Sequence, residues 1–184
     1  MLVEYGIVNL SLIPVRRKNN EKSEMISQLF FGELIEIISK KKNWNLVISN
    51  IDKYKGWIRT SQFLSISKSH YFKLNTKKKK FSYTEMSISN KKIIKYVIPT
   101  GSLISNCNYL GFSYDLNNVK FNNVEEIGLT FLNSPYLWGG KTKFGADCSG
   151  FVQTVFKVCG KILPRDACEQ ALELSLIHIS EPTR

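Results

Sequence analysis

The sequence predicts a multidomain protein in which small β-barrel modules precede the helical, nucleophile-bearing part of an α+β domain. Three observations lead to this fold class. Short β-prone runs separated by polar turns fill residues 3–66, helical spacing of apolar residues starts at Val124, and Cys148 lies between polar neighbours at the start of a second helical pattern. With 184 residues, 43% of them hydrophobic, the chain is long enough to bury such cores.

Residues 1–66 are expected to form the first module. Polar turn residues, among them Gly32 and Asn43, separate its apolar runs. Many short strands within about 60 residues favour a small barrel, because a closed barrel leaves no free sheet edge. The runs are rich in Ile, Val, Leu and Phe and lie at Ile7–Val8, Ile26–Phe31, Leu34–Ile38, Trp44–Ile48 and Gly56–Ile58.

Short sequences in this segment resemble a bacterial SH3-like domain by their order along the chain. They are LIPVR at 12–16, QLFFGE at 28–33, NW at 43–44 and YKGWI at 54–58. The resemblance implies an SH3-like barrel. Trp44 and Trp57 are equally well explained as ordinary core or rim aromatics of that barrel.

Residues 70–122 contain weaker patterns. The lysine run at 77–80 predicts a solvated loop, because like charges repel and resist packing. β-prone stretches follow at 93–98 and 103–104, with turn residues between and beyond them. The sequence PTGSL at 99–103 resembles part of a second SH3-like module of wall peptidases, so 70–122 is the predicted second domain.

Two helices are predicted beyond residue 123. Apolar residues from Val124 to Leu132 share one helix face, and the sequence NSP at 133–135 ends that helix. A second helical pattern begins at Cys148, with Asp147 as its candidate N-cap and Gly160 as its terminator. Cys148 then lies in the first turn, where unpaired N–H groups and the positive end of the helix dipole stabilise a thiolate.

The alternative for any cysteine is a small buried apolar residue. We expect that environment for Cys107, Cys159 and Cys168, whereas the polar neighbours of Cys148 favour a nucleophile. The cysteines include no CxxC pair and the chain has two histidines, so no metal site and no other cofactor is expected.

The sequences PYLWGG at 135–140 and DCSGFV at 147–152 resemble the NlpC family of papain-like cysteine peptidases. The resemblance implies a partial papain-like domain over residues 123–173, with Cys148 as its catalytic nucleophile. It implies hydrolysis of peptidoglycan stem peptides, commonly between γ-D-glutamate and a diamino acid. With an SH3-like module in front, the chain looks like the dipeptidyl-peptidase VI branch, which recycles muropeptides that have a free N-terminal L-alanine.

The same resemblance implies a substrate-binding set beside the nucleophile. Glu24 and Tyr54 of the first module would contact the substrate ammonium, and Asp147 and Ser149 would join them. Tyr136 would orient the substrate or its oxyanion, and residues 163–166 would form a loop that faces the substrate. Ala167 and Cys168 depart from the small hydroxyl residues of the family, which puts one hydrogen bond to substrate in question. The implied substrate-binding residues are Glu24, Tyr54, Tyr136, Asp147, Ser149, Arg165 and Asp166.

Charge and hydropathy limit the partners. A net charge of +11 permits contact with anionic molecules, but no aromatic stacking platform accompanies it, so nucleic acid is not an expected partner. The chain begins with no basic segment followed by a long apolar one, and no apolar run approaches about 18 residues. We therefore expect no membrane span and a cytoplasmic protein.

Residues 174–184 do not resemble the histidine strand of the family, although His178 lies among them. A papain-like thiolate needs a histidine as base, oriented by a third polar group. We therefore expect that 174–184 is a foreign or disordered tail and that the catalytic histidine and its partner are missing from a truncated chain. The alternative function is a non-catalytic SH3-like module that binds cell-wall peptides, which leaves the DCSGF sequence unexplained.

Overall fold

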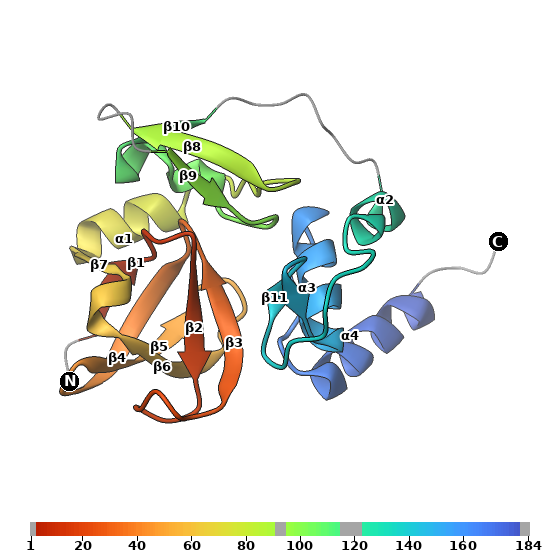
Figure 1. Ribbon diagram of the computed structural model, residues 1–184, viewed down its shortest axis with the longest axis horizontal. Coiled ribbons are helices and arrows are strands. Elements are labelled where there is room, and N and C mark those ends of the chain that lie inside the picture. The colour runs from red at the N-terminus through yellow and green to blue at the C-terminus, as the bar shows by residue number, and fades with distance from the viewer. Residues whose placement is uncertain (1–2, 91–94, 115–122, 181–184) are drawn as a thin grey trace.

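The computed structural model describes residues 3–90, 95–114 and 123–180, with side chains as far as residue 175. Figure 1 shows the first β module, a three-stranded sheet against one end of it, and a helical C-terminal segment at its side. None of the described helices combines the length and the apolar character that crossing a bilayer requires.

The first module is a seven-stranded antiparallel sheet with strands in the order β3-β2-β6-β5-β4-β1-β7. Strands are present at each of the predicted apolar runs. The ladder ends at β3 and β7, so closure of the barrel stays a prediction. The bounds are β1 Glu4–Ile7, β2 Leu12–Arg16, β3 Met25–Phe30, β4 Leu34–Lys41, β5 Trp44–Ser49, β6 Lys55–Arg59 and β7 Leu64–Ile66, with a 3-10 turn at Thr60–Gln62.

This sheet encloses one apolar core because alternate residues of its strands are apolar and face inward. In β2, Ile13 and Val15 are buried while their neighbours are partly exposed. Gly32 forms the predicted turn with φ of +82°, but Lys42 rather than Asn43 adopts the left-handed conformation in the next one. The core comprises Val8, Ile13, Val15, Leu29, Ile35, Ile37, Val47, Ile58 and Phe63.

The second region begins with a helix that the sequence patterns did not predict, α1 (Lys68–Asn75), capped by Ser67. A sheet of order β10-β8-β9 follows, from β8 (Met86–Asn90), β9 (Lys95–Ile98) and β10 (Phe112–Tyr114). The lysines at 77–80 lie in an exposed loop, as predicted. Because 91–94 and 115–122 lie outside the described residues, the predicted strand at 93–98 is seen only from residue 95. The second SH3-like domain over 70–122 stays a prediction.

The C-terminal segment contains α2 (Val124–Leu129), β11 (Lys141–Thr142), β12 (Gly145–Ala146), α3 (Cys148–Val158) and α4 (Ala167–Ser180). α2 ends earlier than predicted, and the chain from 130 to 134 continues in tight turns that bond three residues back. Its face is also only partly buried, since Ile127 is 0% exposed but Leu132 is 69% exposed. Residues 174–180 continue α4. That residues 174–184 are of foreign origin remains a prediction.

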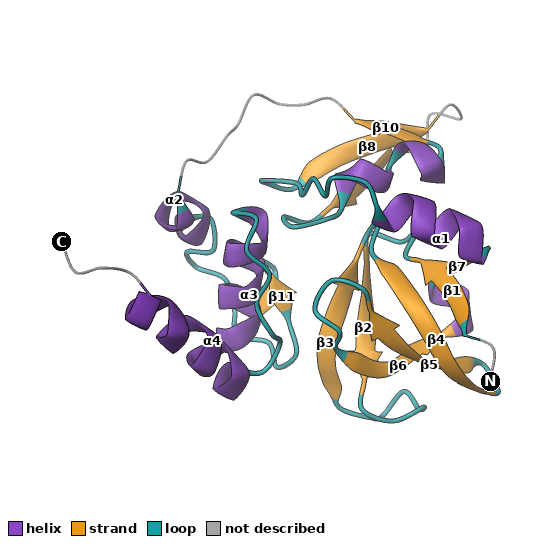
Figure 2. Cartoon of the chain, turned by 180° about the vertical axis from the view of Figure 1, so that it is seen from behind, coloured by secondary structure: helices purple, strands orange, loops and turns teal. Residues whose placement is uncertain are grey.

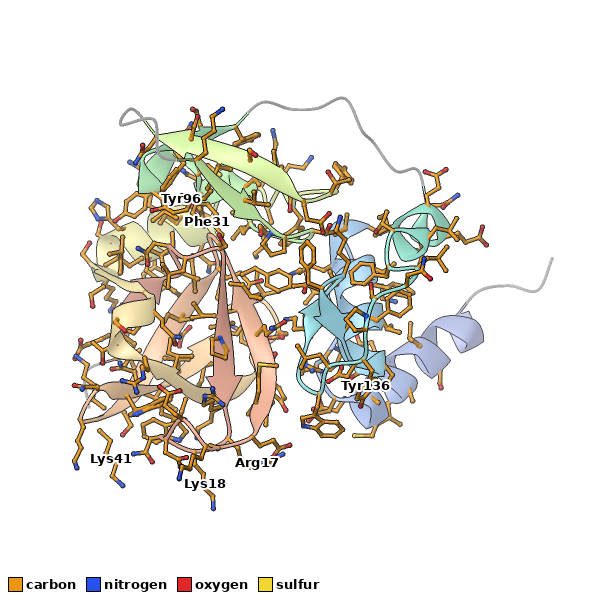
Figure 3. The ribbon with its side chains drawn as sticks, viewed as in Figure 1. Arg17, Lys18, Phe31, Lys41, Tyr96 and Tyr136 are labelled. Atoms are coloured by element: carbon orange, nitrogen blue, oxygen red, sulfur yellow. The ribbon has the colours of Figure 1, made fainter. Side chains whose placement is uncertain are left out.

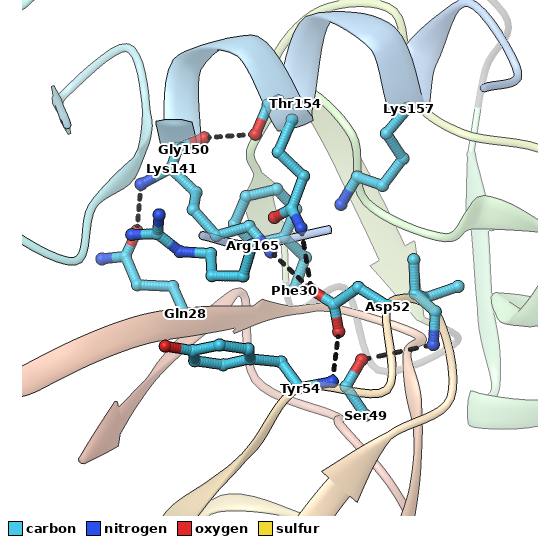
Figure 4. A network of polar contacts seen from close by, with 12 residues as sticks. Gln28, Phe30, Ser49, Asp52, Tyr54, Lys141, Gly150, Thr154, Lys157 and Arg165 are labelled. Carbon is cyan, nitrogen blue, oxygen red and sulfur yellow. Dashed lines mark hydrogen bonds and ion pairs between the residues drawn. The ribbon is translucent and has the colours of Figure 1, made fainter. Parts of the chain in front are cut away.

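α3 lies beside β3 of the first module (Figure 2), and buried polar side chains such as Lys157 and Asp52 lie at this junction (Figure 4). Lys157 Nζ on α3 lies 3.0 Å from Glu33 Oε1, and both side chains are 1% exposed. The same ammonium lies 4.0 Å from the centroid of the Phe30 ring, a favourable cation–π distance. At this point of the junction, the charged side chains of Lys157 and Glu33 are packed where the helical pattern alone would suggest apolar contacts.

A second set of contacts strengthens this junction. Gln153 Nε2 donates to Asp52 Oδ2 at 3.0 Å, and the backbone N–H of Lys141 donates to Gln28 Oε1 at 2.8 Å. Burial lowers the pKa of Lys141 to about 8, although Asp52, with a carboxylate oxygen 3.9 Å from its Nζ, acts in the opposite direction. Residues from both segments thus hold the helix in one position against the sheet.

We predict that Lys157→Met destabilises the fold by about 3 kcal/mol, because Glu33 then remains buried without its cation. Urea unfolding followed by circular dichroism measures the change. The double variant Lys157→Met/Glu33→Gln should recover most of the loss. The exposed Lys18→Met is the control, and a loss below about 0.5 kcal/mol in the single Lys157 variant would contradict the assignment.

Candidate active site

Cys148 is the first residue of α3, as the sequence predicts, and its side chain is exposed. Asp147 caps the helix: its Oδ1 accepts the Gly150 N–H at 2.7 Å. The thiol therefore lies at the positive end of an eleven-residue helix and lines two adjoining pockets. This position is accessible to a substrate.

A buried network fixes the start of that helix. Asp147 Oδ2 accepts from Arg165 Nη2 at 2.6 Å and from the Gly139 N–H at 2.8 Å, and Arg165 Nη1 donates to Ser149 Oγ at 2.7 Å. Burial opposes the charged form of Asp147, but Arg165 and the N–H of Gly150 outweigh it, so the pKa of Asp147 lies below its usual value. Arg165 is only 3% exposed, so it supports the carboxylate beside the nucleophile.

The double glycine of the PYLWGG sequence brings the two segments together. Gly139 has φ of +77°, and a Cβ at this position would lie 2.4 Å from the carbonyl oxygen of Met25 on β3. Only glycine allows this approach while its N–H donates to Asp147. The loop that precedes Cys148 is consequently held against the first module.

The first module contributes Glu24 to the pocket, but both of its carboxylate oxygens are occupied. Trp138 Nε1 donates to Glu24 Oε1 at 2.8 Å, while Arg17 donates from Nε to Oε2 at 2.5 Å and from Nη2 to Oε1 at 3.2 Å. The hydrogen bond from Arg17, followed by that from Trp138, lowers the pKa of Glu24. Glu24 is therefore an ionised side chain whose charge Arg17 compensates.

Tyr54 and Asp166 meet across the same pocket, because the Tyr54 hydroxyl donates to Asp166 Oδ1 at 3.0 Å. Burial and then this hydrogen bond raise the pKa of Tyr54 to about 12, so the phenol keeps its proton at neutral pH. Asp166 is exposed and forms no ion pair within the described part of the chain. It is the pocket carboxylate with an uncompensated charge.

All eight residues singled out from the sequence, Cys148 included, line one pocket of about 180 Å³ between the two segments. One of them, Tyr136, is labelled in Figure 3 on the C-terminal segment. Their roles toward a substrate remain predictions. The sequence reasoning missed four further lining residues. Trp138 belongs to the PYLWGG sequence, and Ala167 was noted as a departure from the family, so both could have been included, whereas no local pattern signals Arg17 or Ile26. The four are Arg17, Ile26, Trp138 and Ala167.

A second, mostly apolar pocket of about 410 Å³ lies on the other side of the thiol and is lined by α2 residues such as Phe131. Tyr136 is 69% exposed and lines both pockets. No residue lining either pocket is a histidine. His178 is on α4, but its side chain is outside the described residues, so the predicted lack of a catalytic base stays a prediction.

Of the three other cysteines, all expected to be buried, one is buried and two are exposed. Cys107 is buried, which raises the pKa of its thiol to about 11. Cys159 and Cys168 are exposed, and the expectation that they are core residues is wrong. Cys159 is the C-cap of α3 and Cys168 lies in the first turn of α4, so both are at helix ends.

Two family models match the chain. Residues 133–184 match the NlpC/P60 family, and residues 15–63 match the bacterial dipeptidyl-peptidase Sh3 domain. A γ-D-glutamyl-L-lysine dipeptidyl-peptidase of Bacillus subtilis (strain 168) is 54% identical over 46 residues, 25% of this chain and 16% of that protein. One of the same name from Bacillus cereus (strain ATCC 10987 / NRS 248) is 25% identical over an alignment that covers 81% of this chain and 55% of the relative. The chain thus spans about half the length of that relative.

Solved structures show the same fold. An NlpC/P60 family protein from Bacillus cereus ATCC 10987 superposes with a TM-score of 0.70 at 16% identity, covering 91% of this chain and 76% of that one. An NlpC/P60 endopeptidase from Photobacterium damselae subsp. piscicida superposes with a TM-score of 0.61 at 20% identity, covering 91% and 45%. An SH3-like domain followed by an NlpC/P60 segment therefore describes the architecture.

We predict that Asp147→Asn changes the acid stability of the protein. Asparagine keeps the helix cap but removes the charge that pairs with Arg165. Because the pKa of Asp147 is below its ordinary value of 3.8, ionised Asp147 stabilises the fold above about pH 4, and this contribution is lost as the pH falls through its lowered pKa. The variant should be about 1–2 kcal/mol less stable at pH 7, and the difference should shrink in acid. Urea unfolding between pH 7 and pH 2 measures this, and parallel pH profiles would rule out Asp147 as the source.

Proposed function

The chain carries a bacterial dipeptidyl-peptidase SH3 domain and an NlpC/P60 segment, and we propose that it is a cysteine peptidase that hydrolyses peptidoglycan stem peptides at the γ-D-glutamyl-diamino-acid bond. The observation that carries this proposal is the exposed Cys148 at the start of α3, at one side of a pocket formed jointly by both segments. The names of the relatives support γ-D-glutamyl-L-lysine as the cleaved unit. Muropeptide recycling or wall turnover is the corresponding role.

In the proposed reaction, the Cys148 thiolate attacks the γ-carbonyl carbon of the D-glutamyl residue. The carbon–nitrogen bond then breaks, the amine of the diamino acid leaves with a proton, and water hydrolyses the resulting thioester. Tyr136, exposed beside the thiol, is in a position to donate to the developing oxyanion. The lining residues supply the nucleophile and the binding groups, whereas the base that this mechanism requires is not among them.

Recognition of a free N-terminal L-alanine fits the charges of this pocket. The two other carboxylates are already compensated, Asp147 by Arg165 and Glu24 by Arg17. Asp166 keeps an oxygen that can accept from an ammonium, while Tyr54 holds its other oxygen. We therefore assign the main ammonium contact to Asp166 and a supporting position to Glu24. An N-acylated stem would place an uncharged group beside this carboxylate and bind less well.

A second candidate function is binding of wall peptides without hydrolysis. The absence of histidine among the residues that line the two pockets favours it for the described part of the chain. Both functions need the same pocket, and only hydrolysis needs the thiol. The nucleophile variant therefore distinguishes them.

We predict that Cys148→Ala abolishes hydrolysis of L-Ala-γ-D-Glu-L-Lys, measured by release of free lysine. Cys168→Ser, which changes a second exposed thiol close to the pocket, should retain wild-type activity. Activity that survives in Cys148→Ala would contradict the nucleophile assignment. A wild-type chain that binds the tripeptide without cleaving it would favour the binding function.

We also predict that Asp166→Asn weakens binding of peptides with a free amine by about tenfold, since one charge-assisted contact is lost. N-acetylated peptides should be affected little. The measurement is the ratio of dissociation constants for L-Ala-γ-D-Glu-L-Lys and its N-acetyl form with Cys148→Ala as the background. Glu24→Gln is the comparison, and a larger loss of the free-amine preference in that variant would return the ammonium contact to Glu24.

A further inference from the structure

Arg17 is an exposed, charged lining residue with a donor that no described residue uses, whereas the unpartnered Nε of Arg165 is buried. The Arg17 guanidinium has five N–H donors. Nε and Nη2 are held by Glu24, and Nη1 has no partner among the described residues. The side chain is 59% exposed and follows β2 at the edge of the pocket (Figure 3).

The charges of the pocket leave two groups available to a ligand. Asp147 and Arg165 are paired and buried, and the pair of Glu24 and Arg17 is half-exposed. The charged groups of the lining that remain open are one oxygen of Asp166 and the outer edge of the Arg17 guanidinium. Arg17 and Asp166 line the same pocket of about 180 Å³. The hydrogen bond to Glu24 is the main cause of the raised pKa of Arg17, and the charge of Asp166 acts in the same direction. The pocket therefore presents one anion and one cation.

We propose that Arg17 binds the free α-carboxylate of the γ-linked D-glutamyl residue and thereby selects stems whose glutamate is not amidated. This inference rests on the proposed function. In L-Ala-γ-D-Glu the ammonium and the α-carboxylate are separated by at most about 7 Å, the length of two extended residues. Asp166 and Arg17 match these two charges in sign. A guanidinium fork binds a carboxylate with two parallel hydrogen bonds, whereas an α-amide lacks the charge and turns N–H groups toward the donors.

The position of Arg17 is set before a ligand arrives. Glu24 binds it through two hydrogen bonds and is itself held by Trp138 across the junction of the segments. A side chain fixed in this way loses less conformational entropy on binding than a free arginine. Glu24 thus orients the guanidinium of Arg17 that would bind the α-carboxylate of the substrate.

The test compares two dipeptides that differ only at the α-position, L-Ala-D-Glu with its γ-carboxylate free and L-Ala-D-isoglutamine. Isothermal titration calorimetry with the full chain measures both, so that the readout does not depend on hydrolysis. Wild type should prefer the α-carboxylate by about tenfold. Arg17→Gln should abolish that preference by weakening only the α-carboxylate form, and Arg17→Lys should restore part of it.

Lys18→Gln is the matched control, because it removes the same charge from the adjacent exposed residue outside the pocket and should leave the preference intact. Equal affinity of wild type for the two dipeptides, or an equal loss of both in Arg17→Gln, overturns this inference alone. Failure of both dipeptides to bind overturns the proposed substrate class together with it. Absence of hydrolysis with the preference intact overturns only the proposed catalysis.

Discussion

The pocket between the two segments depends on an ion pair that is formed away from water, between Lys157 on α3 and Glu33 on the first module. A buried charge is strongly unfavourable unless its partner is present, so each of these residues requires the other segment to be in place. The pair therefore favours one docking of α3 on the sheet over alternatives that apolar contacts alone would allow. Phe30 beneath the ammonium adds a further favourable contact.

Every contact of the pocket between the segments follows from that docking. Trp138 reaches Glu24 because Gly139 allows the loop that precedes Cys148 to approach β3 within backbone contact distance. Tyr54 reaches Asp166 across 112 positions of sequence. The pocket is thus not a property of either segment alone, and its small volume of about 180 Å³ suits a dipeptide end rather than a long chain.

The pairing of charges decides which pocket groups a substrate can use. Resemblance to the family alone implied an ammonium contact for Glu24 and gave Asp166 only a place in a loop that faces the substrate. The geometry separates them, because Arg17 and Trp138 occupy both oxygens of Glu24 while Asp166 keeps one oxygen open. The structure also revises the role of Arg165. The resemblance implied a substrate contact, whereas its guanidinium donates to Asp147.

Local patterns in the sequence determined the strands of the first module, the start of α3 at Cys148 and the cap at Asp147, because alternation and capping act over a few residues. They failed for α1, where only Tyr71 and Leu74 are buried and the helical pattern is faint. Only the tertiary structure decided that Lys157 and Gln153 are buried, that Arg17 enters the site and that the charge of Glu24 is compensated. The physical reason is that ion pairs and hydrogen bonds between distant segments depend on how these segments dock. The spacing of residues along the chain does not determine that docking geometry.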